Sequence, residues 1–202
     1  MRRLGFRGAS RGFTLIELMI VIALMAILIA LSVPSFRNMI EMQRLRGIHG
    51  ELVTDLQFAR SEAAARGRYV RVNFGFSSDS TCYSIFTADQ NSLRCNCLLD
   101  SALRCPAGTQ EIKTVHVAKS NSVRFAMEPL VAGGPDQDSA FAFDYRSGGL
   151  VTSSFDLGNV PLPAVQIDTI VDAKRTLRTV LIQSGRPSVC APSASTMQVS
   201  AC

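Results

Sequence analysis

Residues 11–17 read RGFTLIE and run directly into an unbroken apolar segment at residues 18–31. A basic residue and the small Gly12 precede a hydrophobic run that carries one acid, Glu17, at its start. An ionised carboxylate is costly in hydrocarbon and is rarely placed there without a partner. Glu17 therefore needs a positively charged group to neutralise it.

This N-terminal segment resembles that of the type IV pilin superfamily, which includes the pseudopilins of type II secretion. Gly12 stands at the cleavage position, Phe13 becomes the new N-terminus, Glu17 is the fifth mature residue, and Pro34 follows the apolar run. The resemblance implies that a prepilin peptidase removes a leader at residues 1–12 and methylates the amino group of Phe13. It also implies that Glu17 pairs with the N-terminal amine of a neighbouring subunit when the filament assembles.

Elementary electrostatics agrees with this pairing. The amine of Phe13 and the carboxylate of Glu17 are each expensive to bury alone and much cheaper to bury as a pair. The two residues lie one helical turn apart, so pairing within one chain is open as well as pairing between chains. Glu17 also lies in the first turn, where the helix dipole favours negative charge.

Two simpler interpretations of the segment are a secretory signal cut after residues 30–32 (ALS) and a plain membrane anchor. A signal peptide fits poorly, because Glu17 opens the apolar run and the helical pattern continues far beyond it. Residues 13–36 reach about 36 Å as a helix, which is enough to cross a bilayer. We therefore expect a transmembrane and assembly helix at 13–36, anchored in the inner membrane before assembly, with the head in the periplasm.

The charge balance changes when the leader is removed. The chain has 21 basic and 16 acidic residues, a net charge of +5. Residues 1–12 hold four arginines and no acid, so 17 basic residues remain against 16 acidic ones, a net charge of +1. The leader arginines favour a cytoplasmic N-terminus. Overall charge is therefore no argument that the mature chain binds nucleic acid.

The helix is expected to continue beyond the apolar run, over residues 13–66, with Gly67 as its C-cap. Pro34 lacks an N–H group, so it predicts a kink near Ala30. Farther on, apolar residues recur at spacings of three and four and form one stripe. The members of this stripe are Leu45, Ile48, Leu52, Leu56, Ala59 and Ala63.

From Tyr69 onward the hydrophobic period changes to two, which indicates strands. Strands are expected at residues 69–74, 82–87, 111–118, 122–127, 140–145, 164–171 and 176–183. The expected fold class is α+β: a long N-terminal helix, membrane-spanning in its first half and amphipathic in its second, packed on a mostly antiparallel β-sheet head domain within 37–202. The tail after Gly185 is rich in Ser, Ala and Pro, and we expect it to be poorly ordered.

Further segments are similar to the minor pilins FimT and FimU and to the pseudopilin GspH. They are PSFRNMI at residues 34–40, LQFARSEA at 56–63 and SGR at 184–186. The resemblance implies a structural minor pilin that primes assembly at or near the filament tip, with other pilin or pseudopilin subunits as partners. A type II secretion pseudopilin is the alternative. The chain has Ala26 where many major pilins have a helix-breaking glycine.

Six cysteines in an exported head suggest disulfides, and six allow 15 full pairings. We expect Cys190 to pair with Cys202 and so to close a C-terminal loop. The other four pair among themselves in an order that the sequence leaves open, although Cys95 and Cys97 are too close to bond comfortably. They are Cys82, Cys95, Cys97 and Cys105. A metal site at Cys95, Cys97 and Cys105 is the disfavoured alternative, because Cys-x-Cys is tighter than usual zinc spacing; no metal or cofactor is expected.

The sequence gives no sign of catalysis, and we expect a protein that is not an enzyme. His49 is interpreted as a solvated residue on the helix and His116 as a structural residue in a strand. The chain carries no nucleophile elbow, phosphate loop or dinucleotide fingerprint.

A DNA-binding minor pilin is a further alternative. Some FimT-like proteins bind DNA through a C-terminal Gly-Arg-x-Arg, and this chain has GRPS at residues 185–188, with only the first arginine. Phosphate contacts require only a basic patch. The candidate residues for such a patch are Lys174, Arg175, Arg178 and Arg186.

Overall fold

The computed structural model describes residues 12–90, 93–127, 139–153 and 159–202, and for residues 31–35 it describes the backbone only. All of the predicted leader except Gly12 therefore lies outside the described residues. The chain divides into two compact units, one ending at Ile40 and one spanning Glu41–Cys202. Each unit is described by itself below.

One helix, α1 (Leu15–Arg66), runs without interruption for 52 residues. It begins where Thr14 caps it: the Thr14 hydroxyl accepts the Glu17 amide at 3.3 Å, and the Thr14 carbonyl accepts the Leu18 amide at 3.2 Å. Capping of this kind satisfies amides that have no partner within the helix. The helix ends at Gly67, which has a positive φ of 63°. The bond from the Arg68 amide to the Ala63 carbonyl completes the cap.

In the first unit the described apolar side chains of α1 are exposed along its length; Leu15, for example, is 77% exposed and Ile29 is 62% exposed. None of the helices in the described part of the chain is long and apolar enough to cross a membrane, so the crossing predicted for residues 13–36 is not confirmed. The helix continues on both sides of Pro34. The Pro34 side chain lies outside the described residues, and the kink stays a prediction.

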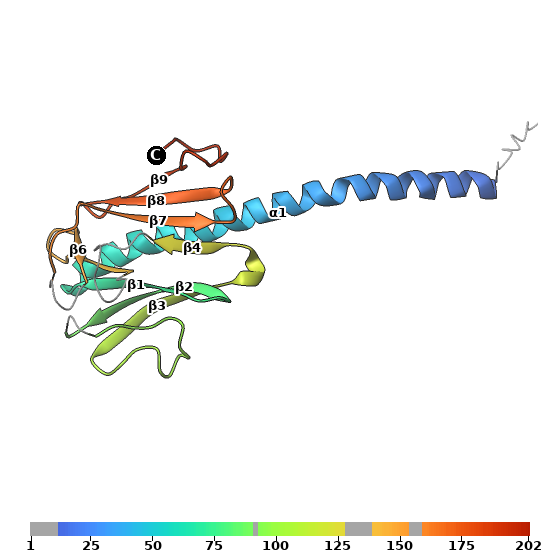
Figure 1. Cartoon of the computed structure of the whole chain (residues 1–202). Helices are drawn as coiled ribbons and strands as arrows, with labels where there is room; N and C mark the ends of the chain where they lie inside the picture. The colour runs from blue at the N-terminus through green and yellow to red at the C-terminus, as the bar shows by residue number, and fades with distance from the viewer. Residues whose placement is uncertain (1–11, 91–92, 128–138, 154–158) are drawn as a thin grey trace, which may run out of the picture. The chain divides into compact units, whose positions relative to one another are not determined.

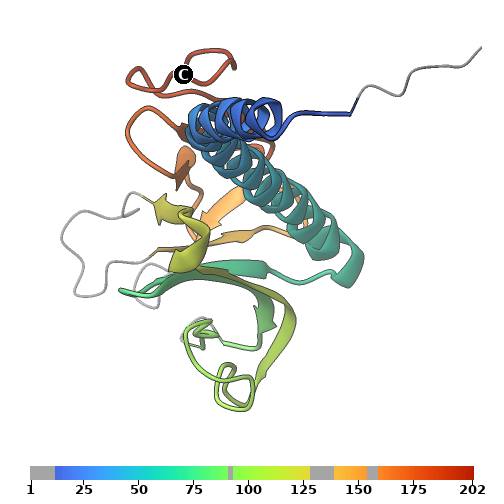
Figure 2. The ribbon, with the colours of Figure 1, turned by 90° about the vertical axis from the view of Figure 1, so that its right-hand side faces the viewer.

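The second unit contains the rest of α1 and two antiparallel sheets (Figures 1 and 2). The five-stranded sheet has the order β3-β2-β1-β5-β6 and the four-stranded sheet the order β4-β7-β8-β9. The strands of the first are β1 (Val70–Phe76), β2 (Ser80–Ala88), β3 (Thr109–Ala118), β5 (Ala140–Phe143) and β6 (Leu150–Thr152). Those of the second are β4 (Arg124–Met127), β7 (Ala164–Ile170), β8 (Thr176–Ile182) and β9 (Pro187–Cys190). A short 3-10 helix, η1 (Lys119–Asn121), leads from the first sheet to the second.

The core lies between the second part of α1 and both sheets. The predicted stripe is buried, with Leu45, Leu52 and Ala59 fully inaccessible and only Ile48 partly buried. The sheets contribute aromatic residues to the same core. Phe74, Tyr83 and Phe125 form an aromatic cluster with ring centroids 5.5–6.0 Å apart. Because each fully buried leucine contributes about 2 kcal/mol, this stripe attaches the helix firmly to the head. The predicted α+β class is confirmed, with two sheets.

All six cysteines form disulfides. Cys190 is joined to Cys202, the pairing expected from the sequence. The other bonds are Cys82–Cys97 and Cys95–Cys105, so two crossed links hold the segment between β2 and β3. The alternative metal site would need the sulfurs of Cys95, Cys97 and Cys105 as thiolates, whereas in this structure all three are in disulfide bonds.

The expectation of a poorly ordered tail is wrong. The segment after Gly185 forms β9 and then folds back through the Cys190–Cys202 bond. The Ser195 hydroxyl donates to the Thr176 carbonyl at 2.7 Å, and Met197 is buried. A short covalent loop lowers the entropy of the unfolded chain, which offsets the low apolar content of the tail.

Candidate functional site

The predicted processing site precedes α1 and is accessible. Gly12 and Phe13 lie outside regular structure, and Phe13 is 79% exposed. A Cβ added at Gly12 would meet no atom within 4 Å. Glu17 is exposed in the first turn of α1, where the positive end of the helix dipole stabilises its negative charge. A cut after Gly12 would create a Phe13 amine four residues before this carboxylate in the sequence.

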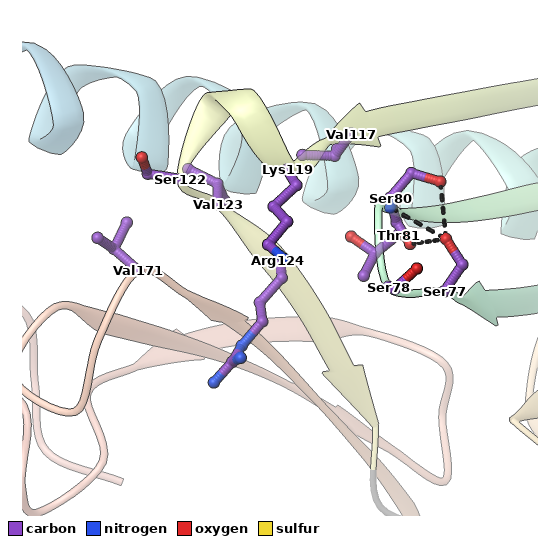
Figure 3. A pocket seen from close by; sticks show the side chains of 10 residues that line it. All are labelled: Ser77, Ser78, Ser80, Thr81, Val117, Lys119, Ser122, Val123, Arg124 and Val171. Carbon is purple, nitrogen blue, oxygen red and sulfur yellow. Dashed lines mark hydrogen bonds between the residues drawn. The ribbon is translucent and has the colours of Figure 1, made fainter.

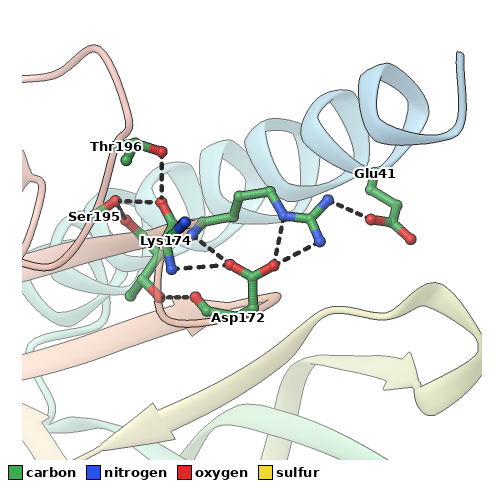
Figure 4. Close-up of polar contacts among 7 residues, drawn as sticks. Glu41, Asp172, Lys174, Ser195 and Thr196 are labelled. Carbon is green, nitrogen blue, oxygen red and sulfur yellow. Dashed lines mark hydrogen bonds and ion pairs between the residues drawn. The ribbon is translucent and has the colours of Figure 1, made fainter. Parts of the chain in front are cut away.

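The structure does not gather the four basic residues of the proposed DNA contact into one patch. Arg175 bonds Asp172 at 2.6 Å and also forms an ion pair with Glu41 of α1 (Figure 4). Hydrogen bonding from Arg175 lowers the pKa of Asp172, and the Asp172 carboxylate in turn raises the pKa of Arg175. Arg175 therefore anchors the β7–β8 turn to the helix.

Arg178 is likewise paired with an acid. Its Nε and Nη2 atoms donate to the two carboxylate oxygens of Asp168 at 2.7 and 2.8 Å. The two residues stand opposite each other in the β7–β8 register. A bidentate pair of this kind neutralises the cation and fixes its direction.

The remaining two basic residues are exposed but lie apart. Lys174 precedes β8 and Arg186 follows it, so the length of the strand separates them by roughly 20 Å. The Lys174 backbone carbonyl accepts bonds from the Thr196 amide and hydroxyl at 2.8 and 3.1 Å (Figure 4). This hairpin accordingly carries two separate exposed cations and two neutralised ones.

Two segments that carried the detailed resemblance meet in the head. Arg60, within residues 56–63, donates from Nε to the carbonyls of Gly148 at 3.0 Å and Ser184 at 3.2 Å. Gly185 has a positive φ of 72°, and a Cβ there would lie 2.2 Å from the Gly148 carbonyl oxygen. The SGR segment is therefore a packing junction beneath the helix, which the sequence analysis did not recognise.

A second polar junction holds α1 to the five-stranded sheet. Lys113 of β3 pairs with Glu51 at 2.9 Å and with Asp55 at 2.7 Å. The Tyr83 hydroxyl donates to Asp55 at 2.7 Å, and burial raises the pKa of Tyr83. Burial alone would lower the pKa of Lys113, but its bonds to the two acids outweigh that effect and raise it. These contacts are structural.

The interpretation of His49 as a solvated residue is wrong. His49 is 4% exposed, and its Nδ1 lies 3.0 Å from the Thr169 hydroxyl, with Nε2 3.5 Å from that of Thr179. Burial lowers its pKa to about 4, against an opposing effect of Asp168. The four-stranded sheet covers a part of α1 that the sequence pattern placed near water. His116 lies in β3 and is exposed.

The chain matches two protein-family models. One is described as the prokaryotic N-terminal methylation motif and matches residues 7–33, and the other is described as type II transport protein GspH and matches residues 50–155. No curated protein matches the chain at a significant level.

Two crystal structures of the type IV minor pilin FimU from Pseudomonas aeruginosa (strain PAO1) are similar to the chain. In space group P65 the identity is 17%, the TM-score is 0.40, and the match covers 74% of this chain and 94% of that one. In space group P21 the identity is 16%, the TM-score is 0.44, and the coverage is 82% and 97%.

Proposed function

Because the chain belongs to the family of the type II transport protein GspH, we propose that it is a minor pilin, a structural subunit of a type IV pilus. In this proposal a prepilin peptidase cuts between Gly12 and Phe13, and the new amine of Phe13 is methylated. The subunit then waits in the inner membrane with its head in the periplasm. It enters the filament beside other pilin subunits, at or near the tip, where it primes assembly.

One observation carries the proposal: a single acid, Glu17, begins a helix whose first apolar part is exposed and whose last part is packed into a head. Exposed apolar side chains on one long helix need a covering, which a bilayer or neighbouring helices can provide. Glu17 at the helix start is then the group that pairs with a Phe13 amine. The three disulfides support a periplasmic head, since such bonds persist in oxidising compartments.

The proposed role is structural and not enzymatic. Buried polar groups such as Asp55 and His49 form hydrogen bonds between α1 and the sheets. These bonds hold the head together, and they leave the helix end and the head surface to contact partners.

A type II secretion pseudopilin is the second candidate. It is favoured by the match of residues 50–155 to the family of the type II transport protein GspH. The two candidates share processing and filament entry and differ in the machine that the filament serves. Deleting the gene separates them: loss of surface pili indicates the first, and loss of protein secretion with intact pili indicates the second.

The test of the shared proposal is to express the full chain with a prepilin peptidase and to analyse the mature protein by mass spectrometry. We expect an N-terminus at methylated Phe13, and we expect the protein in filaments sheared from cells. A mature chain that begins at Val33 would instead identify an ordinary signal peptide and would overturn the proposal.

A further inference from the structure

A cavity of about 370 Å³ opens in the second unit where the β1–β2 turn, η1 and the start of β4 meet (Figure 3). It brings together two cations, Lys119 and Arg124, and serine hydroxyls from the β1–β2 turn. Three valines, Val117, Val123 and Val171, form its apolar walls. Of the described residues that line the cavity, Val171 adjoins the β7–β8 turn, but Lys174, Arg175, Arg178 and Arg186 are not among them.

Both cations are available for a ligand. Lys119 and Arg124 are exposed, and among the described residues neither has an acidic group within 4 Å. The nearby Asp79 contributes its backbone, since its carbonyl accepts the Lys119 amide at 2.8 Å. Two positive charges beside one hollow, without counter-charges, favour an anionic ligand.

The frame around these cations is fixed by hydrogen bonds. The Ser77 hydroxyl accepts the Ser80 amide at 3.0 Å, which closes the β1–β2 turn. The Ser122 amide donates to the Lys119 carbonyl at 2.9 Å, and the Phe125 amide donates to the Thr81 hydroxyl at 3.1 Å. A site whose frame is already ordered spends little free energy on ordering when a ligand binds.

Additional hydrogen-bonding groups lie beside the cations. Across the described part of the chain, the hydroxyls of Ser78 and Ser122 make no hydrogen bond within the protein. Each hydroxyl can donate one bond to an oxygen of an anion. The combination of two cations, hydroxyl donors and aliphatic walls suits a carboxylate that is flanked by apolar groups.

We propose that this cavity binds an acidic peptide segment, with one Glu or Asp carboxylate between Lys119 and Arg124 and aliphatic neighbours against the valines. Its volume lies within the range of pockets that enclose small ligands. A nucleic acid fits less well, because single strands use aromatic stacking and no aromatic residue lines the cavity in the described chain. Duplex DNA needs a longer row of cations. The inference rests on the proposed function in assigning the segment to a neighbouring filament subunit.

The test uses the full chain in detergent and two fluorescein-labelled peptides, GVEVEG and its uncharged counterpart GVQVQG, followed by fluorescence anisotropy. We expect the acidic peptide to bind at least about tenfold more tightly, because charge-assisted hydrogen bonds are the stronger ones. Lys119→Gln and Arg124→Gln should each weaken its binding severalfold. Arg186→Gln, which replaces an exposed cation outside the cavity, is the matched control and should leave binding unchanged.

The comparison of the two peptides on the unmodified chain needs no variant, so a poorly folded variant does not block the test. Equal affinities for the two peptides, or an affinity for the acidic peptide that neither cavity substitution changes, would overturn the inference. A DNA duplex that displaces the labelled peptide at a lower concentration than unlabelled GVEVEG would replace it with a nucleic-acid site. Incorporation into sheared filaments is measured separately: a chain that is incorporated without peptide binding refutes the cavity inference alone, whereas peptide binding without incorporation refutes the proposed function alone.

Discussion

The guanidinium of Arg60 on α1 donates a hydrogen bond to the carbonyl of Gly148, which lies 88 residues farther along the chain. The same carbonyl oxygen faces Gly185, where a Cβ would come within 2.2 Å. Three segments, 56–63, the β5–β6 turn and the SGR segment, therefore converge on one backbone carbonyl. Their spacing depends on the absence of a side chain at position 185.

Gly185→Ala is expected to destabilise the head by about 2–4 kcal/mol. The methyl group would collide with backbone, which a side-chain rotation cannot relieve. The positive φ of 72° adds strain for any residue with a Cβ. The measurement is urea unfolding of the full chain in detergent, followed by near-ultraviolet circular dichroism.

Gly47→Ala is the matched control for this substitution. Gly47 lies inside α1, and a Cβ there meets nothing within 4 Å. Alanine should therefore leave stability unchanged or raise it by up to about 1 kcal/mol, through its better helix propensity. Equal effects of the two substitutions would show that the contact between positions 185 and 148 has no special role.

Much of the fold was accessible from sequence periodicity. The stripe through Leu45 and Ala63 predicted a helix to residue 66 with Gly67 as its cap, and α1 ends at Arg66. The strand predicted at residues 122–127 begins later, at Arg124, because Ser122 adopts a left-handed conformation after η1. Local sequence patterns predict which elements form, but they do not show where a single residue with unusual backbone angles delays the start of a strand.

The strands that were missed are short and depend on distant partners. β6 (Leu150–Thr152) has three residues, and β9 begins with Pro187, a residue that argues against a central strand. β9 is an edge strand, where a proline is tolerated. Such strands are defined by the sheet that receives them, and a single sequence does not show that sheet.

The charges of the candidate site show the same limit. The pairing of Arg178 with Asp168 was within reach, because both lie five residues from the centre of the hairpin at position 173. The pairing of Arg175 with Glu41 was not, since 134 residues separate the two. A cluster of basic residues in a sequence therefore does not predict a positively charged surface when acidic residues from other elements pair with its members in the fold.

The stability of the head should fall as the pH is lowered from about 6.5 to about 4. Burial lowers the pKa of folded His49 to about 4, whereas an unfolded histidine titrates near 6.5. Between these values the unfolded chain binds a proton that the folded chain does not, so stability rises with pH across this window. The difference corresponds to about 3 kcal/mol at most.

Two substitutions test this assignment by urea unfolding at several pH values. His49→Gln should remove much of the pH dependence between 4 and 6.5, although it also changes the contact with Thr169. His116→Gln replaces an exposed histidine and should leave the pH dependence intact. If the stability of both variants varies equally with pH, the pH dependence arises from carboxylates and not from His49.

The four basic residues of the C-terminal hairpin should behave as two classes. Arg178→Ala is expected to lower stability by about 1 kcal/mol, because it leaves the partly buried Asp168 without its bidentate partner. Lys174→Ala and Arg186→Ala, at exposed positions, should change stability by less than about 0.5 kcal/mol. Urea unfolding of the three variants provides the measurement.

The same arrangement predicts weak DNA binding by this hairpin. Two isolated cations engage few phosphates, so affinity for a labelled duplex should be low at about 50 mM salt and should fall only shallowly towards about 200 mM. Tight binding with a steep salt dependence, abolished by Arg186→Ala, would contradict this prediction and would support the DNA-binding alternative.

Glu17 should serve assembly and not the folding of the head. It lies in the unit that ends at Ile40, and the second unit has its own core and disulfides. Glu17→Ala should therefore leave the chain processed and its thermal unfolding unchanged. Incorporation into the filament should fall by about tenfold or more, because the Phe13 amine of a neighbouring subunit would be buried without its carboxylate. Immunoblots of sheared filaments, normalised to the cell-associated protein, measure this ratio.

Glu62→Ala provides the control for the loss of an acid from α1. Glu62 forms an exposed pair with Arg66 one turn away, and such pairs contribute only about 0.3–0.5 kcal/mol. This variant should be incorporated like the unmodified chain. If Glu17→Ala is incorporated equally well, the carboxylate has no part in assembly, and the N-terminal amine must be neutralised by another group. If Glu17→Ala accumulates unprocessed, the residue acts earlier, in recognition by the peptidase, and the assembly role would have to be tested on a chain whose leader is removed independently.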